Sequence, residues 1–251
     1  METKELLEKA NGLYDAGKYE EALPLYLNLV SDTDAEIMLR IGVCYVEIAE
    51  ASGHQETAYH QAEEWLLKAA ALGNAEAQLE LGHLYFYGYY YGRGVAKSDA
   101  QEAVKWYKLA AEQGNAEAQT WLGLCYQDGR GIEKNSQTAL QWFHAAAKQN
   151  FPDALYYIAF CYSVGDGVEQ DEQKATEWFQ KAAELGDVDA MCVLGINYQN
   201  GDGVEKDISK AIYWYEMAAK NGDYEAMDIL VELIDKGYEE AREALNRIKS
   251  D

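Results

Sequence analysis

Residues 74–85 read NAEAQLELGHLY, residues 115–126 read NAEAQTWLGLCY, and a third copy, DVDAMCVLGINY, spans residues 187–198. Each copy carries a small residue near its centre, with a leucine or isoleucine just before it and a tyrosine three residues after it. Across the chain these small residues are Gly42, Gly82, Gly123, Ala159 and Gly195. Glycine inside a helix normally costs about 1 kcal/mol relative to alanine. Because glycine nevertheless recurs at the same position of the repeated motif, we predict a helix that packs closely against a neighbouring helix at this position.

A second helix is expected around regularly spaced tryptophans. They are Trp65, Trp106, Trp142, Trp178 and Trp214, with spacings of 41, 36, 36 and 36 residues. An alanine precedes each by three residues and an alanine pair follows, which places alanine and tryptophan on one helix face. Eight residues after the tryptophans stand Gly73, Gly114, Asn150, Gly186 and Gly222. Glycine and asparagine tolerate the left-handed backbone that ends a helix, so each helix is expected to end there.

The two helices are joined by a Gly-x-Gly-Val-like loop at residues 92–95, 129–132, 165–168 and 201–204. Such a loop could cradle a phosphate, but no strand precedes it, as a phosphate-binding loop requires. The alternating aspartates of a calcium loop are also missing. We interpret the four copies as turns that each end in one apolar residue.

The composition limits the partners. The chain has 251 residues and a formal net charge of −23, which argues against nucleic acid and anionic membrane surfaces because both would repel it. No stretch approaches the roughly 18 apolar residues of a membrane span, and the first residues lack the pattern of a signal peptide. Cys44, Cys125, Cys161 and Cys192 form no Cys-x-x-Cys pair, which fits a reducing cytoplasm.

Taken together, these motifs resemble the Sel1-like repeat, a relative of the tetratricopeptide repeat, over about residues 34–237. KAIYWYEMAAKNG at residues 210–222 matches its second helix. The resemblance implies an all-α fold, a right-handed α-α superhelical solenoid of stacked antiparallel two-helix repeats. We expect one continuous solenoid, made of a tetratricopeptide-like hairpin (1–33), five repeats (34–73, 74–114, 115–150, 151–186 and 187–222) and a C-terminal capping hairpin (223–251).

Two repeats depart from the family pattern. The repeat at 151–186 has Ala159 in place of the central glycine and Pro152 near the start of its first helix. In the repeat at 34–73, ASGHQETAYH replaces the Gly-x-Gly loop.

In the family that these motifs resemble, the first helices line a concave face, so residues there that are unsuited to a solvated surface are candidates for binding. The positions just after, two and three before, and four after the small residue are unusually apolar. The predicted partner-binding groove comprises Leu79, His83, Phe86, Trp121, Leu124, Tyr156, Tyr157, Phe160 and Ile196. Trp and Tyr are favoured at binding hot spots. The alternative is that tight packing between adjacent first helices buries these side chains.

Two further features border the expected groove. A carboxylate stands in the first turn of each first helix, at Glu36, Glu76, Glu117, Asp153, Asp189 and Glu225, where it would also favour the helix dipole. Extra tyrosines lengthen one repeat, and we expect a loop contact with a partner, or packing on the next repeat, from Tyr87, Tyr89, Tyr90 and Tyr91.

These features predict a non-enzymatic adaptor that binds a protein or peptide in its groove, and the resemblance implies roles in signalling, protein assembly or bacterial host contact. An acidic rim would suit a basic, amphipathic partner. It would not suit the acidic motifs that tetratricopeptide clamps bind, because only Arg40 is well placed for them. We expect no cofactor and no metal. The alternatives are an acidic inhibitor, immunity protein or chaperone for a basic partner, and a hydrolase. His54, His60, His83 and His144 are scattered.

Overall fold

The computed structural model describes residues 2–52, 56–87 and 99–250, and these residues form helices and turns without any strand. The chain divides into two compact units, unit 1 (Met1–Lys134) and unit 2 (Asn135–Asp251). The division falls inside the repeat expected at residues 115–150. Consecutive helices pack against each other within each unit. The predicted all-α class and its two-helix repeats are therefore confirmed.

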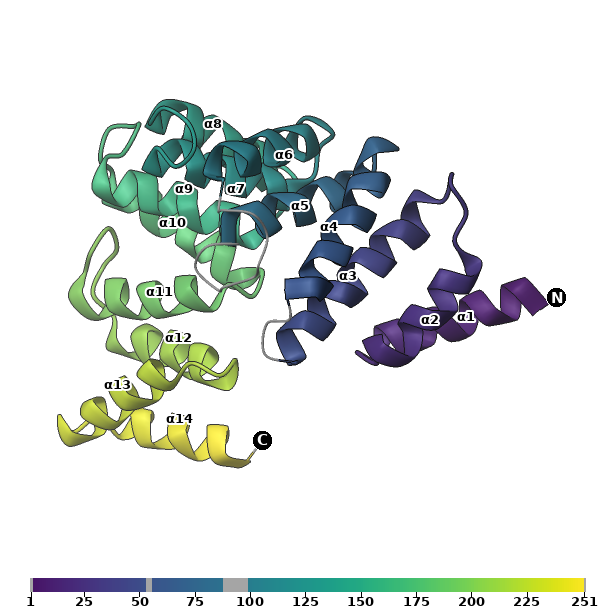
Figure 1. The fold of residues 1–251 in the computed structure, drawn as a ribbon. Coiled ribbons are helices and arrows are strands. Elements are labelled where there is room, and N and C mark those ends of the chain that lie inside the picture. Colours follow the sequence, from purple (N-terminus) through teal and green to yellow (C-terminus); the bar gives the residue numbers. More distant parts are fainter. Residues whose placement is uncertain (1, 53–55, 88–98, 251) are drawn as a thin grey trace. The chain divides into compact units, whose positions relative to one another are not determined.

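Unit 1 contains seven of the described helices, and each contacts the next along the chain. Figure 1 labels them in chain order. They are α1 (Glu2–Asp15), α2 (Tyr19–Leu29), α3 (Ala35–Ala51), α4 (Glu56–Ala71), α5 (Ala75–Tyr87), α6 (Ala100–Glu112) and α7 (Ala116–Asp128). The first helices of its repeats are α3, α5 and α7, and α3 also contacts α5 directly.

Unit 2 has the same construction. Its described helices are α8 (Ser136–Ala147), α9 (Pro152–Val164), α10 (Glu172–Glu184), α11 (Val188–Asn200), α12 (Ile208–Lys220), α13 (Tyr224–Asp235) and α14 (Glu239–Ser250). Figure 1 shows α11 to α14 following one another toward the C-terminus. The first helices of this unit are α9, α11 and α13.

The helix ends lie where the sequence predicts them. Gly73, Gly114, Gly186 and Gly222 all have positive φ, and Asn150 is the described non-glycine residue with positive φ, at 58°. The end of α10 shows how this backbone turn terminates a helix. The Gly186 amide donates to the Ala183 carbonyl and the Asp187 amide donates to the Ala182 carbonyl, both at 3.0 Å. These bonds satisfy carbonyls at the end of the helix. Asp187 then caps α11 by accepting from the Ala190 amide at 2.7 Å.

The glycines inside first helices allow close packing, as expected. A Cβ atom added at Gly82 would lie 2.4 Å from the Tyr107 ring of α6, and one at Gly195 would lie 2.4 Å from the Tyr215 ring of α12. Both rings are almost fully buried. In these two repeats the large core residue of the second helix therefore occupies the space that the missing glycine side chain leaves open.

The described Gly-x-Gly loops have a structural task. In each, the second glycine has positive φ and packs against the first turn of an earlier second helix. A Cβ atom added at Gly131 would lie 2.0 Å from the Ala100 carbonyl oxygen. One added at Gly167 would lie 2.5 Å from the Ser136 carbonyl oxygen, and one added at Gly203 would lie 2.2 Å from the Glu172 carbonyl oxygen. Only glycine permits this approach, so the interpretation of the loops as turns is supported by a contact between repeats.

The C-terminal helix α14 is joined to α12 by an ion pair. Arg247 donates to both carboxylate oxygens of Glu216, at 2.8 and 2.7 Å. Glu216 is only 7% exposed, and Lys220 lies 3.4 Å from the same carboxylate. The two cations hold the pKa of Glu216 below its usual value, Arg247 being the stronger influence.

Candidate functional site

The first helices α9 and α11 border a pocket of about 340 Å³ in unit 2, which we call the α9–α11 pocket. Its apolar wall contains Tyr156 and Phe160 from α9, Phe179 from α10 and Val193 from α11. Glu172 begins α10 and Asp202 follows α11, so both carboxylates lie at the end of the pocket where α9 and α11 finish. Two predicted groove residues, Tyr156 and Phe160, thus line one cavity.

Contacts between elements hold the pocket wall in place. The Tyr156 and Phe179 rings meet edge to face with centroids 5.4 Å apart. At the far end, the Thr176 hydroxyl lies 3.0 Å from the Glu172 carbonyl oxygen and 3.2 Å from the Asp202 carbonyl oxygen. Asn197 Nδ2 donates to the same hydroxyl at 2.9 Å. The pocket is therefore preformed.

Aspartates gather where α9 and α11 begin, and we call Asp153, Asp187 and Asp189 the acidic row. Desolvation raises the pKa of Asp187, and the charges of Asp153 and Asp189 raise it further. Desolvation also raises the pKa of Asp153, and Asp189 adds to that shift. Burial raises the pKa of Tyr156, to which the charges of Asp189 and Asp187 contribute. Tyr156 lines the pocket and stands three residues after Asp153 on α9, so the acidic row borders the pocket at this end.

Unit 1 brings four of the predicted residues into one aromatic cluster. The Trp121 ring lies edge to face with His83 and with Phe86, at 5.3 Å in both cases, and with Tyr87 at 5.6 Å. The core residue Tyr107 stacks on Trp121 at 5.9 Å. These rings come from α5, α6 and α7, so the predicted residues of neighbouring repeats do meet here.

The predicted residues differ in exposure. In unit 1, Leu79 is 1% and Phe86 is 8% exposed, so they offer partners little surface, while His83, Tyr87, Trp121 and Leu124 are half-buried. In unit 2, Tyr156 and Tyr157 are half-buried, and Phe160 and Ile196 are 40% and 42% exposed. Tyr157 stacks on Phe143 at 5.3 Å. Tyr89, Tyr90 and Tyr91 lie outside the described residues.

Sequence reasoning missed part of the α9–α11 pocket, namely Phe179, Val193, Glu172 and Asp202. Phe179 follows a repeat tryptophan, a position held elsewhere by Leu66, Tyr107, Phe143 and Tyr215. All of these side chains are buried. Attention to this register could have identified Phe179 as the floor behind the first helices.

The cysteines and histidines support structural roles. Burial is the main reason that the pKa values of Cys44, Cys125, Cys161 and Cys192 rise to about 12, so their thiols stay protonated at neutral pH. His83 packs against Tyr107 and Trp121, and its Nε2 lies 3.7 Å from a Glu117 carboxylate oxygen. Among the described residues, no group of three or more His, Cys, Asp and Glu side chains could hold a metal ion. His54 lies outside the described residues.

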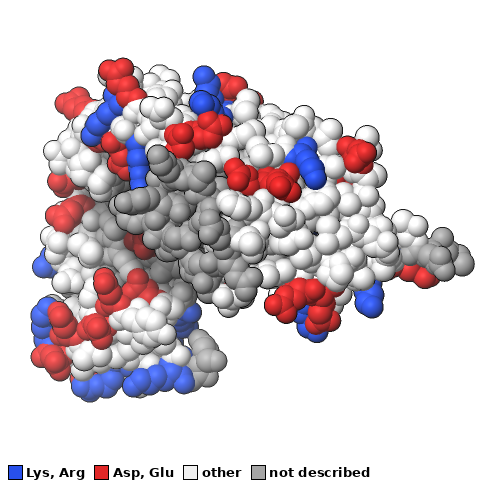
Figure 2. All heavy atoms as spheres, in the orientation of Figure 1, with Lys and Arg blue, Asp and Glu red and all other residues white. Residues whose placement is uncertain are grey.

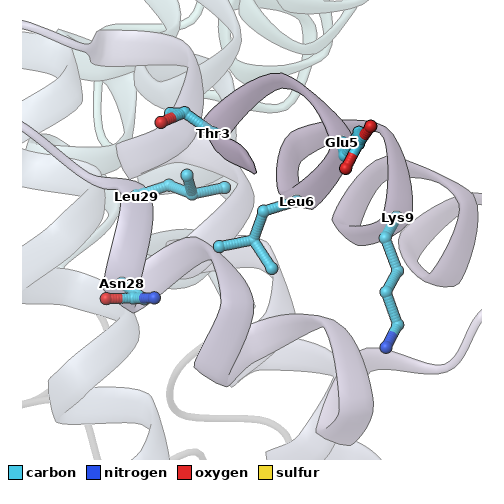
Figure 3. A pocket seen from close by; sticks show the side chains of 6 residues that line it. All are labelled: Thr3, Glu5, Leu6, Lys9, Asn28 and Leu29. Atoms are coloured by element: carbon cyan, nitrogen blue, oxygen red, sulfur yellow. The ribbon is translucent and has the colours of Figure 1, made fainter. Parts of the chain in front are cut away.

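A larger pocket, of about 660 Å³, lies at the N-terminal hairpin. In Figure 3, Leu6 of α1 and Leu29 of α2 point toward the same space, with Thr3 and Asn28 nearby and Glu5 and Lys9 to one side. Its lining mixes both charges with few apolar groups. This pocket contains none of the predicted groove residues.

Charges are unevenly distributed over the face shown in Figure 2. Asp and Glu are spread widely, and Lys and Arg are scattered among them, with a row of basic side chains at the edge of unit 2 where α14 lies in Figure 1. Basic residues of α14 include Arg247 and Lys249 in its last turn. Most ion pairs of the described residues join neighbours on one helix, such as Lys4 with Glu8. Arg40 is also occupied, because it donates to Glu36 at 3.0 Å and covers the Tyr14 ring.

Comparisons with known proteins place this arrangement in a family. The Sel1 repeat profile matches five times, at residues 52–74, 75–115, 116–151, 152–187 and 188–223. These matches cover more than half of the chain. The helix pairs with their repeated register define an α-solenoid repeat protein, and the chain belongs to the Sel1 repeat family. A comparison with functionally curated proteins gave no match.

Solved structures agree with this assignment. A Sel1 repeat protein from Oxalobacter formigenes is 32% identical with a TM-score of 0.79, and the alignment covers 97% of this chain and 98% of that one. The protective antigen c5321 of uropathogenic Escherichia coli is 26% identical with a TM-score of 0.66, over 97% of this chain and 56% of that one. The immunity protein PA5088 from Pseudomonas aeruginosa is 20% identical with a TM-score of 0.52, over 84% and 82%. The last likeness concerns the fold alone.

Proposed function

We propose that the chain is a non-enzymatic interaction module, an adaptor that binds a protein or peptide through the faces of its first helices. Sel1 repeats are generally protein–protein interaction modules. The observation that carries the proposal is the exposure of Phe160 and Ile196, which occupy the same register of α9 and α11. Large apolar side chains that recur on one face beside a preformed pocket are typical of a binding surface.

The setting that we propose is the cytoplasm. All four cysteines are free, and none of the described helices is long and apolar enough to cross a membrane. Free thiols of this kind fit a reducing compartment.

Photocrosslinking in living cells tests the proposal. We would place p-benzoylphenylalanine at position 160 in place of Phe160, and at position 213 in place of Tyr213 as the matched control. Tyr213 is 52% exposed but lies on the second helix α12. A crosslinked protein partner is expected at position 160 and not at position 213. Equal products at both positions, or none at position 160, would contradict a first-helix binding face.

A second candidate is an acidic inhibitor, immunity protein or chaperone that neutralises a basic protein. The observation that favours it is the net charge of −23. Binding dominated by charge would weaken strongly with added salt, whereas binding through apolar anchors would change little. Measuring the affinity for the crosslinked partner over a range of sodium chloride concentrations separates the two.

A further inference from the structure

The α9–α11 pocket combines an apolar centre with negative charge at both ends. Tyr156, Phe160, Phe179 and Val193 supply the apolar surface, and no Lys or Arg is among the lining residues. Glu172 and Asp202 stand at one end. The acidic row lies toward the other end, because Asp153 stands in the first turn of α9, three residues before Tyr156, and Asp189 stands in the first turn of α11.

These carboxylates lack cationic partners in the described part of the chain. Asp153, Asp187 and Asp189 form no ion pair there, and neither do Glu172 and Asp202, although Asp202 accepts a hydrogen bond from Asn200 at 3.1 Å. The adjacent cap of α10 differs, because Asp171 lies 3.0 Å from the Lys174 ammonium group. The charge around the pocket is thus left uncompensated.

Unit 1 has a different arrangement, in which the helix cap does not add a second negative charge beside the carboxylate of the preceding first helix. There the cap of α7 is Asn115, and its Nδ2 donates to Glu76 Oε2 of α5 at 3.0 Å. In unit 2 the cap of α11 at the same register is Asp187, and the residue of α9 at the register of Glu76 is Asp153. An amide–carboxylate hydrogen bond is replaced by two like charges beside an exposed aromatic pocket.

We propose that the α9–α11 pocket receives one large apolar side chain of a peptide or protein segment, whose neighbouring Lys or Arg residues on both sides pair with the acidic row and with Glu172 and Asp202. The inference rests on the proposed function and specifies the chemistry of the partner. Charge complementarity selects this occupant over an acidic or phosphorylated peptide, because either would bring further negative charge to the pocket.

Fluorescence anisotropy with three fluorescein-labelled nonapeptides and the full chain tests the inference. The first peptide has phenylalanine between two Lys-Lys pairs, the second has phenylalanine between two Glu-Glu pairs, and the third has alanine between two Lys-Lys pairs. The first should bind at least tenfold more tightly than either of the others. Phe160→Ala should weaken its binding about tenfold, the scale of one hot-spot residue. Tyr213→Ala, the control on α12, should leave it unchanged.

The acidic groups are tested separately with Asp202→Asn and with the double variant Asp153→Asn, Asp189→Asn. Both should weaken binding of the lysine-flanked phenylalanine peptide more at low salt than at high salt. Circular dichroism melting of every variant checks the fold, and Ile196→Ala, which alters the neighbouring surface of α11, replaces Phe160→Ala if that variant unfolds.

Three results would overturn the inference: equal binding of the glutamate-flanked peptide, equal binding of the alanine peptide, or no effect of Phe160→Ala together with Ile196→Ala. If position 160 still crosslinks to a partner in cells under any of these results, the proposed function stands and only the chemistry assigned to the partner is wrong. If position 160 captures nothing either, both fail.

Discussion

At the scale of single residues, a cap decides whether neighbouring helix starts attract or repel. Asn and Asp are about equally good at capping a helix, so the local requirement does not choose between them. The neighbouring repeat makes the difference: Asn115 donates to Glu76, whereas the charge of Asp153 helps to raise the pKa of Asp187. A position with the same local structure therefore differs in energy because of a residue on another helix.

We predict that Asp187→Asn stabilises the protein at pH 7 by about 0.5–1 kcal/mol, since the cap remains and the repulsion is removed. Asn115→Asp, the reciprocal change in unit 1, should destabilise it by a similar amount. Urea unfolding followed by circular dichroism measures both.

The effect of Asp187→Asn should depend on pH with a defined sign. The raised pKa of Asp187 means that the folded state binds this proton more tightly than the unfolded state. The ionised carboxyl therefore costs stability at pH 7, and the cost disappears as the pH falls through the raised pKa. The difference between Asp187→Asn and the wild type should shrink from pH 7 to about pH 4. A difference that grows on acidification would contradict this account.

At the scale of elements, α14 packs against both α12 and α13. Most of the charge on α14 faces solvent, but Arg247 reaches back to the buried carboxylate of Glu216. The contact ties the last helix to the preceding repeat.

We predict that Arg247→Ala lowers the melting temperature of the protein, because it leaves the buried Glu216 carboxylate without its bidentate partner. The loss should be smaller than for a fully buried pair, because the Arg247 side chain is half exposed. Arg242→Ala is the matched control on α14, since Arg242 pairs with Glu239 at the exposed surface. The lowered pKa of Glu216 gives the sign of the pH dependence: the contribution is present at neutral pH and is lost as the pH falls through the folded-state pKa. Melting temperatures at pH 7 and pH 3.5 measure this pH dependence. If Arg247→Ala and Arg242→Ala lower the melting temperature equally at pH 7, the Arg247–Glu216 ion pair does not stabilise the fold.

Elements were easier to predict than the exposure of their faces. Helix ends such as Gly186 and close contacts such as Gly82 with Tyr107 follow from steric rules that a repeat displays several times. Leu79 and Cys192 occupy one register, yet Leu79 is buried and Cys192 is only half-buried. That difference depends on the side chains of adjacent helices. For the same reason, the sequence indicated Tyr156 and Phe160 but not the walls contributed by Phe179 and Asp202.

At the scale of the whole molecule, negative charge exceeds positive charge by 23. Ion pairs such as Lys18–Glu21 and Lys108–Glu112 are exposed neighbours on one helix or at its start and contribute little each. Repulsion among the remaining acids therefore outweighs them. We predict that raising sodium chloride from about 20 to about 300 mM increases the melting temperature, because salt screens the repulsion. A falling melting temperature would mean that the ion pairs dominate.

The Gly-x-Gly loops have a consequence for how such a chain changes over generations. Gly131, Gly167 and Gly203 each reach back by the same number of residues to the first turn of an earlier second helix. The contact between the loop glycine and the first turn of the preceding second helix is thus part of the repeat sequence itself. A gene that gains or loses one whole repeat by recombination would keep every remaining loop matched to its receiving helix. A change of one repeat therefore alters the length of the first-helix face in a fixed step, whereas point mutations alter single exposed side chains such as Phe160.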